Sequence, residues 1–241
     1  MNTTAPRLFV TSPLHEGADI PLAPDQAHYL GTVLRRDSGA ALRLFNGADG
    51  EWLARFAPGR RTASAIVENR LREQSPETGP WLVIAVLKRD ATDLVVRQAV
   101  ELGASRLLPV LSERTNAARV NPDRLRAIAI EAAEQSERLT IPPIAPLTRL
   151  DAVLSGWDAD RRLFAALERE NADPPPPGPG AAALLVGPEG GFTAGEREML
   201  RRSPFVTPIS LGRFILRAET AAAAGQALLL GRGWGEYPRS T

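Results

Sequence analysis

The hydrophobic pattern of this chain changes near residue 75. Up to residue 73, short apolar runs alternate with turn residues, which is typical of a small β domain. We expect its strands at residues 7–10, 41–45, 52–56 and 63–69. One helix is expected over residues 26–35, with Asp25 as its N-cap. The apolar face of that helix consists of Tyr29, Leu30, Val33 and Leu34.

A polar linker at residues 74–80 precedes a second region, residues 80–241, in which apolar runs alternate with helical patterns. This alternation favours a parallel α/β domain. Its strands are expected at residues 81–87, 106–111, 162–167, 181–186 and 208–211. Its helices are expected at residues 92–102, 122–138, 150–154 and 219–230. Asn121 is the expected N-cap of the second helix, and the last helix, rich in alanine and leucine, is expected to be buried on most sides.

The proline-rich stretch at residues 172–180 has the lowest complexity in the chain and by itself would suggest a domain boundary. However, the strand that follows it needs neighbours, and the nearest partners in sequence lie before the stretch. We therefore expect a surface insertion between two strands of one sheet.

Two predicted strands end in glycine and are followed by a helix. The loop Gly187–Gly191 follows the first strand, and Thr193 with Glu196 forms a T-x-x-E capping box for the next helix. Gly212 ends the second strand. We expect the two loops to be adjacent at the carboxyl edge of one parallel sheet, where ligands bind in open α/β folds. The first loop alone is equally compatible with a tight turn and with a ligand-binding loop.

The chemistry of the first loop excludes some ligands. The loop carries Glu189 and lacks the lysine and hydroxyl of G-x-x-x-x-G-K-[ST], which argues against a polyphosphate. Its spacing also differs from the G-x-G-x-x-G of dinucleotide-binding folds.

Composition adds few constraints. The net charge is +1, and Lys88 is the only lysine among 29 cationic residues, so bulk charge does not indicate a nucleic-acid binder. With no cysteine and 2 histidines, disulfides and thiol chemistry are excluded and a metal site is not expected. No long apolar segment or signal peptide is evident, so a cytoplasmic location is expected.

Several motifs in fixed order resemble the ribosomal RNA small subunit methyltransferase E family, part of the SPOUT methyltransferases. The segments GPEGGFTAGE and ISLGRFILRAETAAAAG are similar to its signature. The resemblance extends to three upstream segments, at residues 28–47, 88–115 and 131–144. It implies a PUA-like RNA-binding barrel, a SPOUT-type parallel sheet with a C-terminal trefoil knot, and a homodimer.

The resemblance also implies an activity, the methylation of N3 of a uridine in 16S ribosomal RNA with S-adenosylmethionine as donor. The cofactor pocket implied by the motifs consists of Leu185, Gly187, Glu189, Gly190, Gly191, Leu211, Gly212, Ile215, Leu216 and Arg217. The implied catalytic residues are Arg217, Glu219 and Arg114. The implied RNA contacts are His28, Arg35, Arg36, Lys88, Arg89 and Arg138.

Each assignment has a structural alternative. The four apolar pocket residues could belong to the core, and Arg217 and Glu219 could form an ion pair that fixes the loops. His28 could be structural, and Arg114 or Arg138 could form a salt bridge between helices. The whole chain could instead methylate another RNA site, or be an RNA-binding module without catalysis.

Two positions depart from the family pattern. Gln98 stands where the family usually has lysine, although Arg97 offers a cation one residue earlier. Glu137 stands where the family often has glycine, which puts the loop before Pro142 in doubt.

Overall fold

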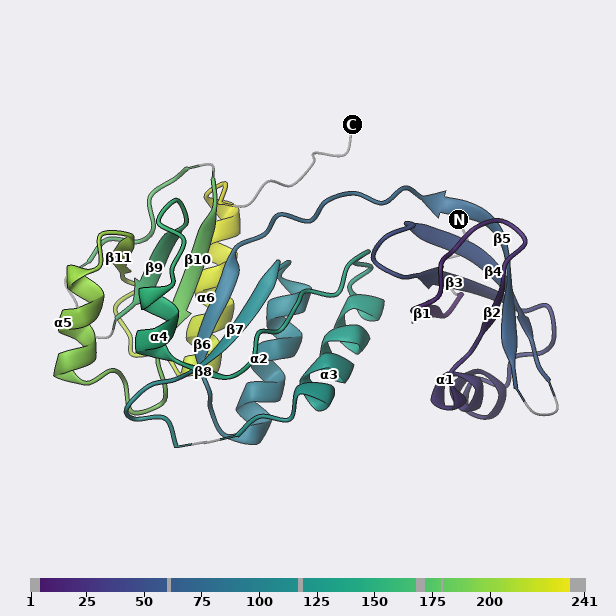
Figure 1. Cartoon of the computed structure of the whole chain (residues 1–241), viewed down its shortest axis with the longest axis horizontal. Helices are drawn as coiled ribbons and strands as arrows, with labels where there is room; N and C mark the ends of the chain where they lie inside the picture. Colours follow the sequence, from purple (N-terminus) through teal and green to yellow (C-terminus); the bar gives the residue numbers. More distant parts are fainter. Residues whose placement is uncertain (1–4, 60–61, 117–118, 168–171, 179, 235–241) are drawn as a thin grey trace. The chain divides into compact units, whose positions relative to one another are not determined.

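The computed structural model describes residues 5–59, 62–116, 119–167, 172–178 and 180–234. The chain forms two compact units (Figure 1). The first comprises residues 1–76 together with residues 133–141, and the second comprises residues 77–132 and 142–241. The sequence pattern did not indicate that residues 133–141 pack with the first unit.

The first unit is built on one five-stranded sheet with the order β1-β3-β4-β5-β2. Its strands are β1 (Arg7–Phe9), β2 (Asp19–Pro21), β3 (Ala41–Phe45), β4 (Glu51–Ala57) and β5 (Ser64–Arg72). The four expected strands are confirmed, with small shifts at their ends. The short strand β2 was not predicted, because three residues are too few to show an alternating pattern. Leu30, Leu42 and Leu44 are among the fully buried residues of the core.

The prediction of one helix over residues 26–35 is wrong in its bounds, its N-cap and its helix type. The structure has α1 (Pro24–His28), followed by a π-helix, η1 (Tyr29–Val33). The N-cap is Ala23, whose N–H donates to the Gln26 side chain at 3.1 Å, and Asp25 lies inside the first turn. Of the expected apolar face, Leu30 is buried and Leu34 packs against the core. Tyr29 and Val33 are 41% and 60% exposed, since the wider π-turn changes which residues share a face.

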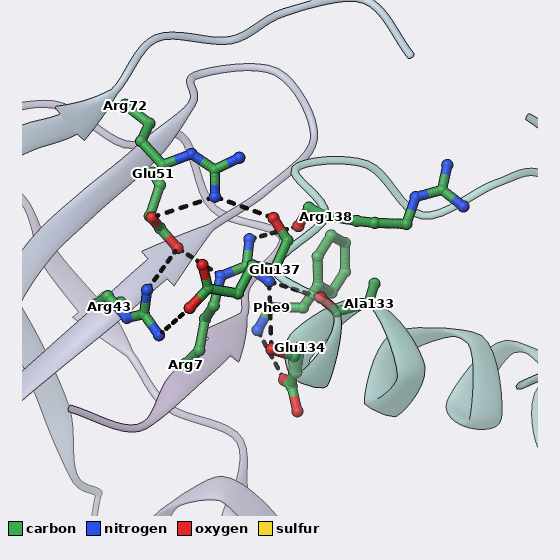
Figure 2. Close-up of polar contacts among 9 residues, drawn as sticks. All are labelled: Arg7, Phe9, Arg43, Glu51, Arg72, Ala133, Glu134, Glu137 and Arg138. Atoms are coloured by element: carbon green, nitrogen blue, oxygen red, sulfur yellow. Dashed lines mark hydrogen bonds and ion pairs between the residues drawn. The ribbon is translucent and has the colours of Figure 1, made fainter. Parts of the chain in front are cut away.

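The end of helix α3 (Pro122–Gln135) belongs to the first unit and is held there by Arg7 (Figure 2). Arg7 Nη1 donates to the Ala133 carbonyl at 2.6 Å, and Nη2 donates to the Arg138 carbonyl. The last carbonyls of a helix lack partners within the helix, so a buried cation there satisfies them and complements the helix dipole. The Asn121 cap is confirmed, because its Oδ1 accepts from the Arg124 N–H at 3.1 Å.

Glu51 balances the charge of Arg7 inside this unit. Its carboxylate is 1% exposed and pairs with Arg7, while Arg72 and Arg43 lie 3.6 and 3.9 Å away. The Arg7 guanidinium also lies over the Phe45 ring, 3.9 Å from its centroid. Burial lowers the pKa of Arg7, and the hydrogen bond to Glu51 opposes that shift.

Glu137 adopts the backbone conformation that glycine favours. Its φ is 59°, in the left-handed region where a side chain is strained. Its carboxylate accepts from Arg43 Nη2 at 2.8 Å, and its carbonyl accepts from Arg72 Nη1 at 2.9 Å. The loop before Pro142 therefore keeps a glycine-type turn although the side chain is present.

The second unit contains a six-stranded sheet with the order β11-β9-β10-β6-β7-β8, in which every neighbouring pair is parallel. Its strands are β6 (Trp81–Ala85), β7 (Arg106–Leu111), β8 (Thr148–Arg149), β9 (Arg162–Ala166), β10 (Ala182–Val186) and β11 (Val206–Ile209). The predicted parallel α/β arrangement is confirmed. Strand β11 begins and ends two residues earlier than expected.

Helices cover both faces of this sheet. One face packs against α4 (Leu150–Ser155) and α5 (Ala194–Arg202), whose leucines join its core. The other face packs against α6 (Ala218–Gly231), which also lies beside α2 (Arg89–Glu101). Gly225 allows this close packing, since a Cβ there would lie 2.6 Å from Leu184 Cδ2. The expected burial of α6 on most sides is wrong for the single chain, because Ala227 is exposed and Ala223, Ala224 and Leu228 are half-buried.

The proline-rich segment joins β9 and β10, which are parallel neighbours. Its interpretation as an insertion between strands of one sheet is therefore confirmed. Trp234 anchors the described part of it, donating from Nε1 to the Pro176 carbonyl at 2.7 Å. Within the described ranges, none of the helices combines the length and apolar character needed to cross a bilayer.

Candidate functional site

Three loops at the carboxyl ends of β6, β7 and β10 are tied together in the second unit. The backbone N–H of Lys88, just after β6, donates to Glu189 Oε1 at 3.4 Å. Arg114, after β7, donates from Nη1 to the Gly190 carbonyl at 3.0 Å. Both contacts hold the glycine loop that follows β10, so the predicted cofactor residues Glu189 and Gly190 and the predicted catalytic residue Arg114 lie together.

Glu196 fixes the far end of the glycine loop. It is 5% exposed, and the predicted capping box is present. Its Oε2 accepts from the Thr193 N–H at 2.9 Å, and its Oε1 accepts from the Glu113 N–H at 2.8 Å. Sequence reasoning found the cap and missed the contact with Glu113, because that residue lies in another loop. Glu196 therefore joins the loop after β10 to the loop after β7.

We expect Glu196→Gln to loosen this junction. The amide can accept on one side only, so a partly buried N–H faces an NH₂ group, at a cost of about 1 kcal/mol. Thermal unfolding should show the loss of stability, and Glu198→Gln, on the exposed face of the same helix, serves as the control. An unchanged melting temperature in Glu196→Gln would contradict this role.

The glycine loop presents bare backbone. Gly191 has φ 66°, and a Cβ at Gly187 would lie 2.9 Å from the Phe192 ring, so both positions require glycine. Gly190 is exposed, and a Cβ there would meet Arg114 at an ordinary contact distance of 3.5 Å. Leu185, predicted as a pocket residue, is fully buried within β10 and belongs to the core cluster.

The second corner lies between β11 and α6. Gly212 has φ 120°, and Ile215 is 60% exposed, while Leu211 and Leu216 are half-buried. The neighbouring Phe214 is 69% exposed and was not singled out from the sequence. The expectation that the two corners are adjacent is wrong in one respect. They share the carboxyl edge, but β9 lies between β10 and β11.

Arg217 is the N-cap residue of α6, and Glu219 lies in its first turn. Arg217 is exposed and Glu219 is half-buried. Within the part of the chain that the structure describes, neither forms a salt bridge, so the alternative that they only pair with each other is not supported. Both remain predictions as catalytic groups.

The predicted RNA contacts are distributed over both units. Lys88 and Arg89 are exposed at the start of α2, next to the tied loops. In the first unit, His28, Arg35 and Arg36 are exposed at or just after α1 and η1. Arg138 is only 8% exposed, which leaves it little surface for an RNA contact. All six assignments stay predictions.

At the first departure from the family pattern, Gln98 and the neighbouring Arg97 differ in exposure. Gln98 is half-buried on α2, and its Oε1 is enclosed without a hydrogen-bond partner in the part of the chain that the structure describes. Arg97, one residue earlier, is exposed.

A small apolar cavity of about 10 Å³ lies between β6, β7, α2 and α3, and none of the predicted cofactor residues lines it. Among the described residues, no cluster of three or more potential metal ligands occurs.

Comparison with known proteins identifies the class of protein. A family model described as an RNA methyltransferase domain matches residues 75–230. A second model, an RNA methyltransferase PUA domain, matches residues 22–68. The chain is thus an RNA methyltransferase. Its PUA-like first unit and its parallel α/β second unit agree with the fold class expected from the sequence.

The particular family follows from its relatives. The ribosomal RNA small subunit methyltransferase E of Rickettsia conorii is 36% identical, covering 93% of this chain and 96% of the relative. The enzyme of the same name from Synechocystis is 32% identical over 87% of this chain and 72% of the relative. The chain belongs to the ribosomal RNA small subunit methyltransferase E family.

Solved structures agree with this assignment. A ribosomal RNA small subunit methyltransferase E from Neisseria gonorrhoeae, bound to S-adenosylmethionine, has a TM-score of 0.84 and 29% identity, covering 97% of this chain and 100% of that one. A methyltransferase from Legionella pneumophila in complex with the same cofactor has a TM-score of 0.83 and 25% identity, covering 98% and 100% of the two chains. The trefoil knot stays a prediction.

Proposed function

We propose that this protein methylates N3 of a uridine in 16S ribosomal RNA, with S-adenosylmethionine as the methyl donor. The observation that carries the proposal is the tied glycine loop at the carboxyl edge of the sheet. It presents exposed backbone at Gly190 with no side chain in the way, and its own residues include no lysine for a polyphosphate. S-adenosylmethionine has no phosphate group, and the solved Neisseria relative binds it.

When bound, the cofactor supplies an electrophilic methyl group. The uridine N3–H must lose its proton as the methyl group is transferred, so negative charge develops on the flanking carbonyl oxygens. Arg114 and Arg217 are the cations that we assign to stabilise this charge. Glu219, in the first turn of α6 two residues after Arg217, is the group that we assign to accept the proton. The exposed position of Arg217 and the contact of Arg114 with Gly190 support these roles.

The PUA-like first unit is the proposed site of RNA capture, through His28, Arg35 and Arg36. Lys88 and Arg89 would contact RNA beside the cofactor loop. We also propose a homodimer. On the outward side of α6, Ala227 is exposed and Ala223, Ala224 and Leu228 are only half-buried among the residues that the structure describes, which favours a partner there.

Mass spectrometry of 16S ribosomal RNA tests this function directly. RNA from a strain that lacks the gene should lose one N3-methyluridine, and expression of the wild-type chain should restore it. Purified protein with S-adenosylmethionine should restore the same modification in vitro. Restoration at a different nucleotide would favour the same fold acting on another RNA site, and RNA binding without methyl transfer would favour a non-catalytic homologue.

A further inference from the structure

Two arginines rest on one tryptophan at the amino end of the second unit's sheet, opposite the cofactor loops. Trp81 begins β6 and is in register with Arg106 at the start of β7. The Arg106 guanidinium lies 4.8 Å from the Trp81 ring centroid, and that of Arg161, just before β9, lies 3.7 Å from it. Trp157 packs edge-on against Trp81 at 6.0 Å. All of these residues belong to one compact unit.

The two guanidinium groups are poorly compensated. Both side chains are half-buried, and the Nε atoms of both are enclosed without a hydrogen-bond partner among the described residues. Arg161 Nη1 donates to the Ala182 carbonyl at 3.1 Å. Among the described residues, no carboxylate forms a salt bridge with either arginine.

The charges around Arg161 also favour binding of an anion. Burial lowers the pKa of Arg161, Asp158 opposes that shift, and the charge of Arg106 adds to it. The Asp158 carboxylate forms a hydrogen bond within its own turn, where its Oδ1 accepts from the Asp160 N–H at 3.1 Å. Two like charges held together without a bound acid form a site that an anion would stabilise.

We propose that Arg106 and Arg161, stacked on Trp81, form a binding site for a phosphate group of the RNA backbone. Stacking on an indole pre-orients a guanidinium and leaves its N–H groups in the plane that matches phosphate oxygens. The five residues of β6 place this site ~16 Å from the cofactor loops, a span that a structured RNA covers easily. The inference rests on the proposed RNA methylation, because that function makes RNA the polyanion this protein meets.

Binding of the full-length protein to unmodified 16S ribosomal RNA over a KCl series tests the site. Each phosphate contact contributes about 0.7–0.9 to the slope of log affinity against log salt. Because the two arginines share one phosphate, Arg106→Gln and Arg161→Gln should each weaken binding and lower that slope, and the double variant should lower it by about this amount. Arg202→Gln is the matched control, since it removes the same charge from an exposed residue already paired with Glu198 at 2.8 Å. Its slope should equal that of the wild type.

The variants Arg106→Lys and Arg161→Lys test whether a folding defect explains the loss of binding. They keep the positive charge and remove only the planar guanidinium group. They should retain the slope and lose part of the affinity. Equal affinities and slopes in wild type and both glutamine variants would overturn the site. Inorganic phosphate titrated into the protein distinguishes the source, and phosphate binding that these variants lose, with an unchanged RNA slope, would overturn RNA as the ligand. Failure of the proposed function is a separate result, the absence of methyl transfer by the wild type.

Discussion

Replacement of Gly190 by tryptophan is expected to abolish binding of S-adenosylmethionine while the protein stays folded. A Cβ at this position meets only Arg114, at 3.5–3.6 Å, so the backbone need not move. The indole would then occupy the mouth of the glycine loop, where the proposed cofactor lies. We expect the affinity to fall at least about 100-fold, which corresponds to about 2.7 kcal/mol. Calorimetry with S-adenosylmethionine and its demethylated product measures the loss.

Gly31→Trp is a suitable control, because a Cβ at Gly31 has open space around it and the residue is exposed in η1 of the first unit. This variant should bind the cofactor as the wild type does. ATP should bind to neither protein, since residues 187–191 lack the lysine and hydroxyl of a phosphate-binding loop and carry the acidic Glu189 instead. Full affinity in Gly190→Trp, with an unchanged melting curve, would remove the glycine loop from the cofactor site.

Several features of the fold that depend on neighbouring residues were predictable from the sequence, although the N-cap expected at Asp25 was not correct. Asn121 and the pair Thr193–Glu196 cap helices by contacts within three residues, and both caps are present. Strand β7 has its predicted bounds, because a continuous apolar run between turn residues identifies a buried strand. The position of Gly103 after α2, with φ 75°, follows from the same kind of local rule.

Features that depend on distant residues were not predictable. Which strand separates β10 from β11 is decided by pairing across the sheet, and the hydrophobic pattern carries no information on it. Likewise, the contact of Glu196 with Glu113 joins residues 83 positions apart. The glycines in the sequence suggested the candidate site, which stays a prediction, whereas the contacts between its loops required the structure.

The discontinuous first unit illustrates the same limit. Residues 133–141 carry no signal that separates them from α3, yet they pack with the N-terminal sheet. Arg7 provides the physical reason, since its guanidinium satisfies carbonyls 126 and 131 residues further along the chain. A single arginine in a short strand gives no indication of such a role in the sequence.

Arg7→Met is therefore expected to be the most destabilising of the substitutions considered. It leaves Glu51 buried without its direct partner and removes the hydrogen bonds that Arg7 donates to the Ala133 and Arg138 carbonyls. Breaking a buried ion pair from one side typically costs about 3–5 kcal/mol. Arg43 and Arg72 stay near Glu51, so the lower end of that range is expected. Urea denaturation of the full chain measures the change.

The double variant Arg7→Met with Glu51→Gln separates the ion pair from the helix cap. If the charge left on Glu51 dominates, the double variant is more stable than Arg7→Met alone, because no unpaired charge remains buried. Arg55→Met is the control in the same sheet, as its ion pair with Glu68 is exposed and its loss should not change stability measurably. Equal stability of Arg7→Met and Arg55→Met would show that Arg7 does not hold the end of α3 in the first unit.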